Sequence, residues 1–474
     1  MTQWYATVRE SLLKDGKTCN QLKRIKWSIN SLADLNPSFN PTKKNKTQLL
    51  TNTSNFQKKE TIINRDAAEI FLQDIGLRLA GQYSKCLTLI NQIQQKNHEN
   101  EWKSQIKSQN KTKHKRKIIR AVNHPIQNMN LKYNEYISIL QERELYKTKV
   151  IKSLQNMETL HFDTYQLVYQ LLAKDRPTIK RFQQADQNLI AATFTEIRSR
   201  HSSSVETMAD IVCDIKSMTG RLKLSEQCNN FNKENKLLFP HEHTIDSFLR
   251  GRLGIQLLCD HYISLHNLKP YGTITFNCNF AEVIEAAVTE SKIICTQNML
   301  IAPDVHVSFQ NTNGQMTLIR PWMHHVLVEV LKNAMASSAK KMILSKNDDN
   351  VPPPIHIQIV EKKDCFDCMI VDNGVGLSDE HISKAFKFAE TGSSRRWDRL
   401  EAQQSYAAPQ TATLGGMGVG LPLSLMMMQM FGGDIYLQNR SSISFRQEGD
   451  EGMETGCIVT IRIMKDTLMQ QKLY

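Results

Sequence analysis

Apolar residues recur at three- and four-residue steps through much of residues 61–266, which is the spacing of one face of a helix. Phe71, Ile75 and Leu79 carry this period in the first stretch. The stretches that show it cover residues 61–93, 131–174, 177–222 and 243–266. Four long helices with little strand signal between them predict an antiparallel four-helix bundle.

The pattern changes near residue 271. Apolar and polar residues alternate with period two, as in half-buried strands, over residues 355–360, 434–438 and 457–463. Helical stretches over residues 280–297, 322–340 and 421–431 separate them. We expect an α+β chain, with a helical bundle over 59–268 and an α/β sandwich over 275–474.

Charge is concentrated in two segments of the 474-residue chain, whose net charge is +13. Residues 1–58 and 96–120 each carry +7, which leaves about −1 for the rest. We interpret 96–130 as an exposed basic insertion, and its stretch Lys111–Lys117 lacks interleaved aromatic residues, so a nucleic-acid partner is not expected. The acid-poor, Ser/Thr/Asn-rich extension 1–58 is typical either of a mitochondrial presequence or of an ordinary disordered tail.

Cysteine usage indicates a reducing compartment, because ten cysteines are scattered without a disulfide framework. We interpret Cys365 and Cys368 as buried free thiols, because no second pair follows at zinc spacing. The run Met426–Met428 predicts core packing. No apolar run approaches the roughly 18–20 residues that span a bilayer, so no membrane span is expected.

The helix predicted over 322–340 carries a polar row opposite its apolar face. His325, Glu329 and Asn333 stand at four-residue steps, with Lys332 beside them. This row has two readings: a solvated face, or a general base with a histidine that tunes it and an amide that ligates Mg²⁺. The helix alone does not decide between them.

Two glycine-rich loops follow. A strand ends in Asp372, and Gly374 and Gly376 come directly after it. Residues 415–422, Gly-Gly-Met-Gly-Val-Gly-Leu-Pro, lead into a helix whose N-terminal N–H groups suit phosphate. No Gly-Lys-Ser/Thr follows, so this is not a Walker A loop. Each loop is weak evidence alone, but the order E-x-x-x-N, D-x-G-x-G, G-x-G-x-G is specific.

These ordered motifs resemble the GHKL ATP-binding (Bergerat) fold of histidine kinases, Hsp90, type II topoisomerases and MutL. Glu329–Met335 and Gly418–Pro422 resemble the mitochondrial protein kinases, namely pyruvate dehydrogenase kinase and branched-chain 2-oxo acid dehydrogenase kinase. The helical segments 71–80, 197–210 and 248–266 are similar to helices of the same family.

The resemblance implies roles for the polar row. Glu329 would be the general base that takes the proton of a substrate serine, and His325 would hold and tune its carboxylate. Asn333 would coordinate the Mg²⁺ that bridges the ATP phosphates, and Lys332 would add positive charge.

The resemblance also implies the nucleotide contacts. Asp372 would accept from the adenine amine, with Thr455 assisting through water. Residues 377–414 would form the ATP lid. The remaining implied contacts are Gly374 and Gly376 close to the nucleotide, Thr391 in the lid, Gly416, Gly418 and Gly420 around the phosphates, and Leu421 directly after them.

Several positions depart from the family pattern. Ala336 stands where the family has Arg, Val375 replaces the middle glycine of a triple glycine, and Glu454 replaces a glycine before Thr455. Residues 464–474 lack the Asp-Trp pair of the pyruvate dehydrogenase kinase tail. None of these removes the base, the Mg²⁺ amide or the adenine carboxylate.

The implied function is a mitochondrial-matrix protein serine kinase that uses ATP and Mg²⁺. It would inactivate the decarboxylating component of a pyruvate or branched-chain 2-oxo acid dehydrogenase complex, dock on the lipoyl domain of the acyltransferase, and form a homodimer. Two alternatives stay open: a structural subunit that retains the kinase fold, and a histidine kinase. The histidine kinase would need His201 as phosphoacceptor, but Ser202–Ser204 follow it where an acidic residue is expected.

Overall fold

The computed structural model describes residues 65–94, 126–173, 184–223, 242–269, 271–345, 351–389, 418–440 and 455–465. The extension 1–58 and most of the basic insertion therefore lie outside the described residues. In these ranges no helix is long and apolar enough to cross a membrane. The chain divides into two compact units. One comprises residues 1–22, 73–174 and 199–255, and the other 23–72, 175–198 and 256–474.

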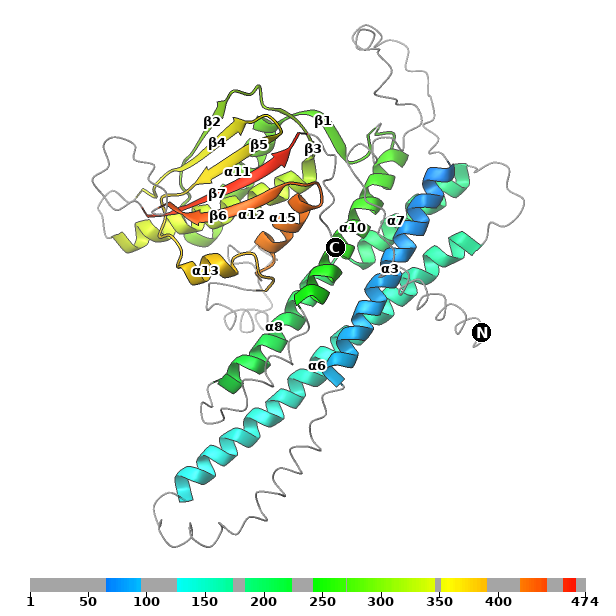
Figure 1. The fold of residues 1–474 in the computed structure, drawn as a ribbon, viewed down its shortest axis with the longest axis vertical. Helices are drawn as coiled ribbons and strands as arrows, with labels where there is room; N and C mark the ends of the chain where they lie inside the picture. Colours follow the sequence, from blue (N-terminus) through cyan, green and yellow to red (C-terminus); the bar gives the residue numbers. More distant parts are fainter. Residues whose placement is uncertain are drawn as a thin grey trace. The chain divides into compact units, whose positions relative to one another are not determined.

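Long helices make up the described part of the first unit (Figure 1). They are α6 (Ile126–Ala173), α8 (Ser204–Lys223) and most of α3 (Arg65–Gln94), together with the first part of α10 (Glu242–His266). These bounds agree with the predicted helical stretches, and α6 also takes in the last five residues of the predicted insertion. The antiparallel bundle arrangement and the boundary between 268 and 275 stay predictions.

The stretch 177–222, predicted as one helical run, contains two helices. The helix α7 (Gln184–Arg200) ends before a turn at His201–Ser203, and α8 begins at Ser204. The physical reason lies in the turn: the Ser204 N–H bonds the His201 carbonyl three residues back, 3.2 Å away. The same carbonyl accepts from Arg252 of α10. An apolar period continues across such a break and does not reveal it.

The helices of the first unit are joined by buried polar side chains as well as by apolar packing. Gln82 of α3 is fully buried and donates from Nε2 to the Phe248 carbonyl of α10, 3.0 Å away. Lys85, one turn further along α3, donates to the Ser247 carbonyl at 2.9 Å. Leu154 on α6 is completely buried. These two hydrogen bonds fix the position of α3 along α10, which apolar contacts alone do not specify.

The second unit contains a mixed five-stranded sheet in the order β2-β4-β5-β7-β6. Only β2 and β4 run parallel, and the other neighbours are antiparallel. A separate two-stranded antiparallel sheet is formed by β1 and β3. The strands are β1 (Ile274–Asn279), β2 (Val305–Gln310), β3 (Gln315–Ile319), β4 (Ile355–Glu361), β5 (Cys365–Val371), β6 (Asp434–Asn439) and β7 (Cys457–Met464).

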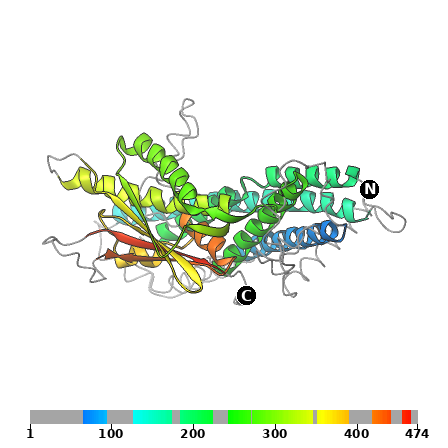
Figure 2. The ribbon, with the colours of Figure 1, turned by 90° about the horizontal axis from the view of Figure 1, so that it is seen from above.

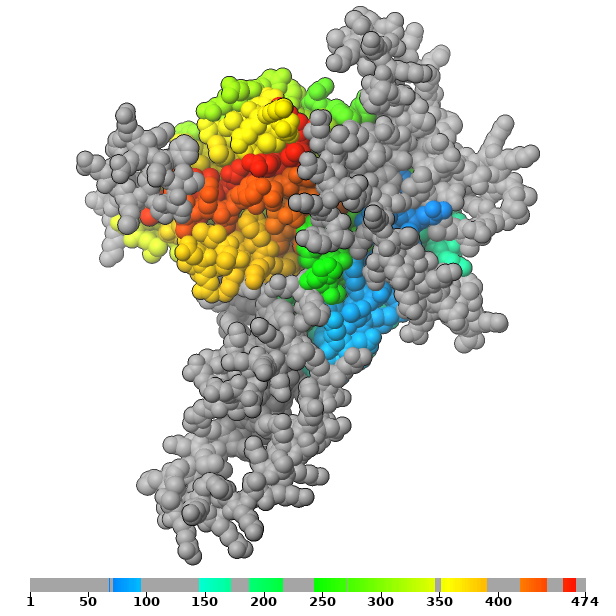
Figure 3. Space-filling view, viewed as in Figure 1, coloured from blue at the N-terminus to red at the C-terminus, as the bar shows by residue number. Residues whose placement is uncertain are grey.

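One face of this sheet is covered by α11 (Phe280–Met299) and α12 (Arg320–Ser345), as Figures 1 and 2 show. Ile357, Ile370 and Val459 are register partners on that face and are buried. On the opposite face the strands themselves form the visible surface in Figure 3. Tyr436 on β6 points there and is 44% exposed. The layered α+β architecture expected from the sequence is confirmed.

The alternating segments correspond to β4, β6 and β7, but β1, β2 and β3 have no counterpart among the predicted strands. Five of the six residues of β2 are exposed, so this edge strand has no buried face to produce alternation. The register of β1 shifts between Thr275 and Cys278. Both features remove the period-two signal on which strand prediction depends.

The predictions about sulfur-containing side chains are confirmed. Cys365 and Cys368 are free and buried, as are the other described cysteines. Met426–Met428 are buried on α15 (Gly420–Gln429). A short helix, α13 (Asp379–Lys384), begins at Ser378, whose side chain caps it by accepting from the His381 N–H.

Candidate nucleotide-binding and catalytic site

The polar row of α12 is largely withdrawn from solvent. The Glu329 carboxylate and the Lys332 ammonium group form an ion pair of 2.7 Å, with side chains 17% and 10% exposed. Asn333, the next residue, is exposed. The solvated-face reading therefore fails for Glu329 and Lys332. An acid held beside a buried cation, with a free amide next to it, is suited to binding charged groups.

His325 lies one turn before Glu329 on the same helix. Burial lowers the pKa of the imidazole, while the nearby Glu329 carboxylate acts in the opposite direction. Burial prevails, so the ring is neutral at pH 7. Its Nε2 is buried and has no hydrogen-bond partner among the described residues. The ring is thus placed near the carboxylate, as the sequence predicted, although no hydrogen bond joins the two.

Asp372 stands directly after β5 and is only 4% exposed. Its Oδ1 accepts from the Gly374 N–H at 2.9 Å. Burial raises the pKa of the carboxyl group, and hydrogen bonds from Gly374, Cys457 and Ser337 oppose that rise. A buried carboxylate with unused acceptor capacity is the expected receptor for an exocyclic amine.

The turn after Asp372 is held from β6 and β7. The Thr455 hydroxyl donates to the Gly374 carbonyl at 2.8 Å. The Asn439 side chain accepts from the Leu377 N–H and donates to the Leu377 carbonyl, at 3.0 and 2.6 Å. Gly376 has a φ of +73°, which favours glycine. Three hydrogen bonds from distant parts of the chain thus fix a loop whose own sequence indicates only a turn.

The second glycine-rich loop meets α12 at the start of α15. A Cβ at Gly420 would collide with the Glu329 carboxylate, so a larger residue there would displace that side chain. Gly418 has a φ of +72°, and its carbonyl accepts from the Ala389 N–H at 2.8 Å. The N-terminal end of α15 therefore lies against Glu329. Leu421 occupies the first turn of α15, whereas Thr391, Gly416 and Glu454 lie outside the described residues.

The donor set fits the ligands that the sequence implies. Asn333 presents an amide oxygen of the kind that Mg²⁺ accepts, on the turn after Glu329. Asp372 offers a buried acceptor for the adenine amine, and the glycines leave room for close backbone approach. Because α12 carries Glu329 and Asn333, and contacts the Asp372 turn through Ser337, one rigid element links the two ends of the site.

Three residues of this arrangement were not among the sequence predictions: Ser337, Asn439 and Gly456. Ser337 follows Asn333 by four residues, so extending the row of α12 by one step would have found it. Asn439 and Gly456 come from β6 and from the residue before β7, with no local signal. Gly456 has a φ of +124°, and a Cβ there would meet the Asp372 carbonyl.

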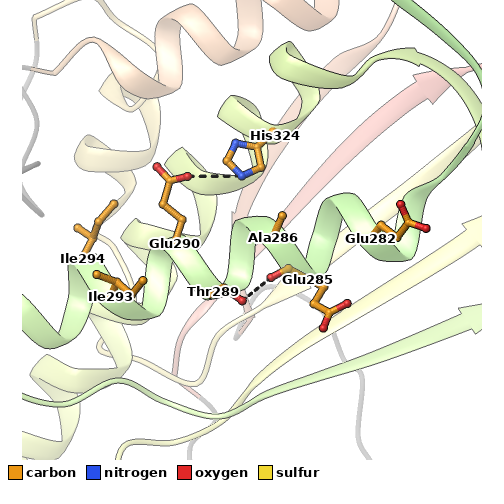
Figure 4. Close-up of a pocket in the computed structure, with 8 residues that line it drawn as sticks. All are labelled: Glu282, Glu285, Ala286, Thr289, Glu290, Ile293, Ile294 and His324. Carbon is orange, nitrogen blue, oxygen red and sulfur yellow. Dashed lines mark hydrogen bonds and ion pairs between the residues drawn. The ribbon is translucent and has the colours of Figure 1, made fainter.

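A surface groove of about 670 Å³ runs along α11, separate from these residues. Its lining includes three glutamates of α11 and His324 of α12, and His324 pairs with Glu290 at 3.4 Å (Figure 4). His324 and its neighbour His325 thus face different surroundings. His325, four residues before Glu329, lies near that carboxylate, whereas His324 lines the groove.

Comparisons with known proteins agree with this geometry. Residues 319–467 match the family model described as histidine kinase-, DNA gyrase B- and HSP90-like ATPase. Residues 82–277 match the model described as mitochondrial branched-chain alpha-ketoacid dehydrogenase kinase. The first match contains α12, the Asp372 turn and the start of α15. Residues 319–467 are thus similar to the ATPase domains that this model describes.

Individual relatives define the family more closely. The mitochondrial pyruvate dehydrogenase (acetyl-transferring) kinase isozyme 4 of Rhinolophus ferrumequinum is 26% identical over 271 residues, covering 52% of this chain and 57% of the relative. Isozyme 1 of Rattus norvegicus is 25% identical over 277 residues, covering 56% of each. The matches therefore span somewhat more than half the length of these relatives. Over somewhat more than half of its length the chain is therefore similar to mitochondrial pyruvate dehydrogenase kinases.

Among solved structures, the catalytic domain of histidine kinase ThkA overlaps 41% of this chain and 97% of its own. The sequence identity is 16% and the TM-score 0.26, too low to bear on the fold or the function.

Proposed function

We propose that the chain is an ATP-dependent protein serine kinase of mitochondria, acting in the matrix on the decarboxylating component of a 2-oxo acid dehydrogenase complex. The observation that carries this proposal is the convergence of Glu329, Lys332 and Asn333 with the glycine start of α15. The names of the relatives support both the substrate class and the compartment.

The chemistry of the site follows from its charges. Glu329 accepts the proton of the substrate serine as the hydroxyl attacks the terminal phosphorus of ATP, the bond from that phosphorus to the bridging oxygen breaks, and ADP leaves. His325 shapes the surroundings of the Glu329 carboxylate. Lys332 balances the negative charge of Glu329 and of the incoming phosphates. Asn333 would hold Mg²⁺, which supplies neutralisation of phosphate charge when bound.

At the other end of the site, Asp372 accepts the adenine amine, with Thr455 beside it. Thr455 also fixes the Gly374 carbonyl, so the adenine contacts are set before the nucleotide arrives. Gly374, Gly376, Gly418 and Gly420 permit close approach, and Gly416, Thr391 and Leu421 complete the proposed nucleotide contacts. Docking on the lipoyl domain of the acyltransferase and homodimer formation belong to the same proposal.

The structure bears on the two alternatives. His201 is completely buried and its Nε2 is bonded to Thr164 Oγ1 at 2.9 Å, which opposes a phosphoacceptor role. A structural subunit would not need the Glu329–Lys332 pair or the glycine that makes room for it. These observations favour the kinase.

The test is transfer of γ-phosphate from ATP to purified pyruvate and branched-chain 2-oxo acid dehydrogenase complexes. We expect phosphate on serine of one decarboxylating component, and loss of it in Glu329→Gln with ATP binding retained. ATP binding without transfer to either complex would contradict the proposal and favour the structural subunit. Comparing the two complexes identifies the substrate.

A further inference from the structure

Ser337 joins the catalytic helix to the turn that follows β5. It lies on α12, two helical turns beyond Glu329. Its Oγ accepts from the Val375 N–H at 3.1 Å, and the same hydroxyl acts on the Asp372 carboxyl group, whose pKa it lowers. One side chain thus engages both the proposed adenine acceptor and the backbone of the glycine turn.

The packing at this contact is unusually close. A Cβ at Gly374 would collide with the side chain and the carbonyl carbon of Ser337, so the turn lies directly against the helix. On its other side the Gly374 carbonyl accepts from Thr455. The Gly374 peptide is therefore held between two hydroxyl-bearing residues, and only one of them, Thr455, belongs to the adenine contacts implied by the sequence.

We propose that Ser337 is a positioning residue of the adenine site, whose hydroxyl fixes Asp372 and the Gly374–Gly376 turn in the geometry that binds the nucleotide. This inference rests on the proposed function, because it assumes that Asp372 receives adenine. It adds a residue that neither the motifs nor the comparisons assign.

The adjacent Ser338 provides a matched control. It is fully buried on the same helix, and its hydroxyl has no hydrogen-bond partner among the described residues. Ser337→Ala and Ser338→Ala delete the same atom and make the same change in helix propensity. Only the first deletes a bond to Asp372 and Val375, so the difference between the two variants isolates the hydroxyl.

The pH dependence of binding separates positioning from a merely structural role. The groups that act on Asp372 are the hydrogen bonds of Ser337, Gly374 and Cys457 and the charge of Arg440, all of which lower its pKa against the effect of burial. The Cys457 thiol, with a pKa of about 12, stays neutral in the range tested. Removing the Ser337 bond raises the pKa of Asp372, so protonation weakens adenine binding at a higher pH.

The experiment is calorimetric titration of the full chain with ADP and Mg²⁺ between pH 5 and 8, alongside thermal unfolding without nucleotide. We expect about tenfold weaker ADP binding in Ser337→Ala, with its acid-side loss moved to higher pH, and wild-type behaviour in Ser338→Ala. Ionisation of the ADP phosphates is common to all variants and cancels in the comparison.

Ser337→Cys separates the loss of the hydroxyl from the loss of side-chain packing. It fills the space of the serine side chain but offers only a weak S–H donor. It should bind ADP nearly as weakly as Ser337→Ala. Wild-type affinity in Ser337→Cys, or equal affinity and pH profile in Ser337→Ala and Ser338→Ala, would overturn the role of the hydroxyl. If wild type bound no ADP, or Asp372→Asn bound it normally, the proposed adenine site would itself fail.

Discussion

The first unit buries the imidazole rings of His161 and His201 with their centroids 4.7 Å apart, whereas the second buries the Asp372 carboxylate and the Glu329–Lys332 pair. Both clusters place ionisable groups away from water. In the first, burial lowers the pKa of His161 to about 4 and that of His201 to about 2. Both rings are therefore neutral at pH 7.

The partners of the two clusters differ in kind. His161 Nδ1 forms a hydrogen bond with the Met157 carbonyl at 2.6 Å, and His201 forms one with Thr164. Arg252 donates a hydrogen bond to the His201 carbonyl. In the second unit the carboxylates face glycines, Gly420 against Glu329 and Gly374 against Asp372. Burial alone thus does not mark a reactive site. What distinguishes the second cluster is that each buried acid is packed against a glycine, where backbone can approach a ligand.

The largest expected difference between the clusters is in phosphotransfer. Glu329→Gln should reduce acid-stable phosphate on serine by about a thousandfold, because a positioned base contributes 10²–10⁴-fold. His201→Ala should retain transfer within about threefold per folded molecule. The measurement is phosphoamino acid analysis with and without acid treatment. Acid-labile phosphate on the chain itself that is lost in His201→Ala would show that the histidine cluster, and not Glu329 acting on serine, carries the phosphotransfer.

Arg252 tests whether the first cluster is structural. Its Nε and one terminal nitrogen donate to the His201 carbonyl at 3.0 and 2.8 Å, and the residue is 3% exposed. Arg252→Ala should lower the free energy of unfolding by about 2–4 kcal/mol, because a buried acceptor loses its charged donors. The control is Arg198→Ala, which removes the more exposed ion pair with Asp260 and should cost less than about 1 kcal/mol. Equal urea midpoints for the two variants would contradict this.

Glycine packing can be tested with a matched pair. Gly420→Ala pushes a methyl group into the Glu329 carboxylate and should cost about 1–3 kcal/mol while impairing phosphotransfer. Gly76→Ala, in the middle of α3, places its Cβ 3.4 Å from Val168 and should stabilise the helix by about 0.5–1 kcal/mol. Thermal unfolding and the transfer assay measure both. Full activity in Gly420→Ala would show that the close packing of Gly420 on Glu329 is not needed for phosphotransfer.

The last comparison concerns the pH dependence of stability. Unfolding returns His161 and His201 to a pKa near 6.5, so below that pH the unfolded chain takes up protons that the folded chain does not. Each such histidine should lower the free energy of unfolding by about 1.4 kcal/mol per pH unit as the pH falls from 6 towards 4. His201→Gln should remove one of these contributions. Urea unfolding at several pH values measures the slope, and an unchanged slope would show that His201 titrates normally when folded.

Much of the site was predictable because its motifs are local. Glu329 and Asn333 are one turn apart on a helix, so their common face follows from helical geometry. Asp372 directly follows strand β5, and Gly418 and Gly420 stand at the start of helix α15. The helices and the strands with one buried face were likewise visible, because burial on one side leaves a period in the sequence.

Other features leave no such period. The exposed edge strand β2 has no buried face, and the turn at His201 interrupts a helical pattern without altering its apolar stripe. The solvated-face interpretation of the α12 row failed at Glu329, because no signal in the neighbouring sequence shows that α15 lies against this residue.

By itself the sequence predicted the long helices, the strands with one buried face, the positions of the proposed base, amide and adenine carboxylate, and the family resemblance. Only the tertiary structure decided which groups close on one another: Ser337 and Thr455 around Gly374, Asn439 against Leu377, and Gly420 against Glu329. The physical reason is the separation of the contacting residues along the sequence. Spacing along the chain fixes neighbours within a helix or strand, whereas these contacts join residues 38 to 81 positions apart, or two separate helices, and depend on how the sheet and helices pack.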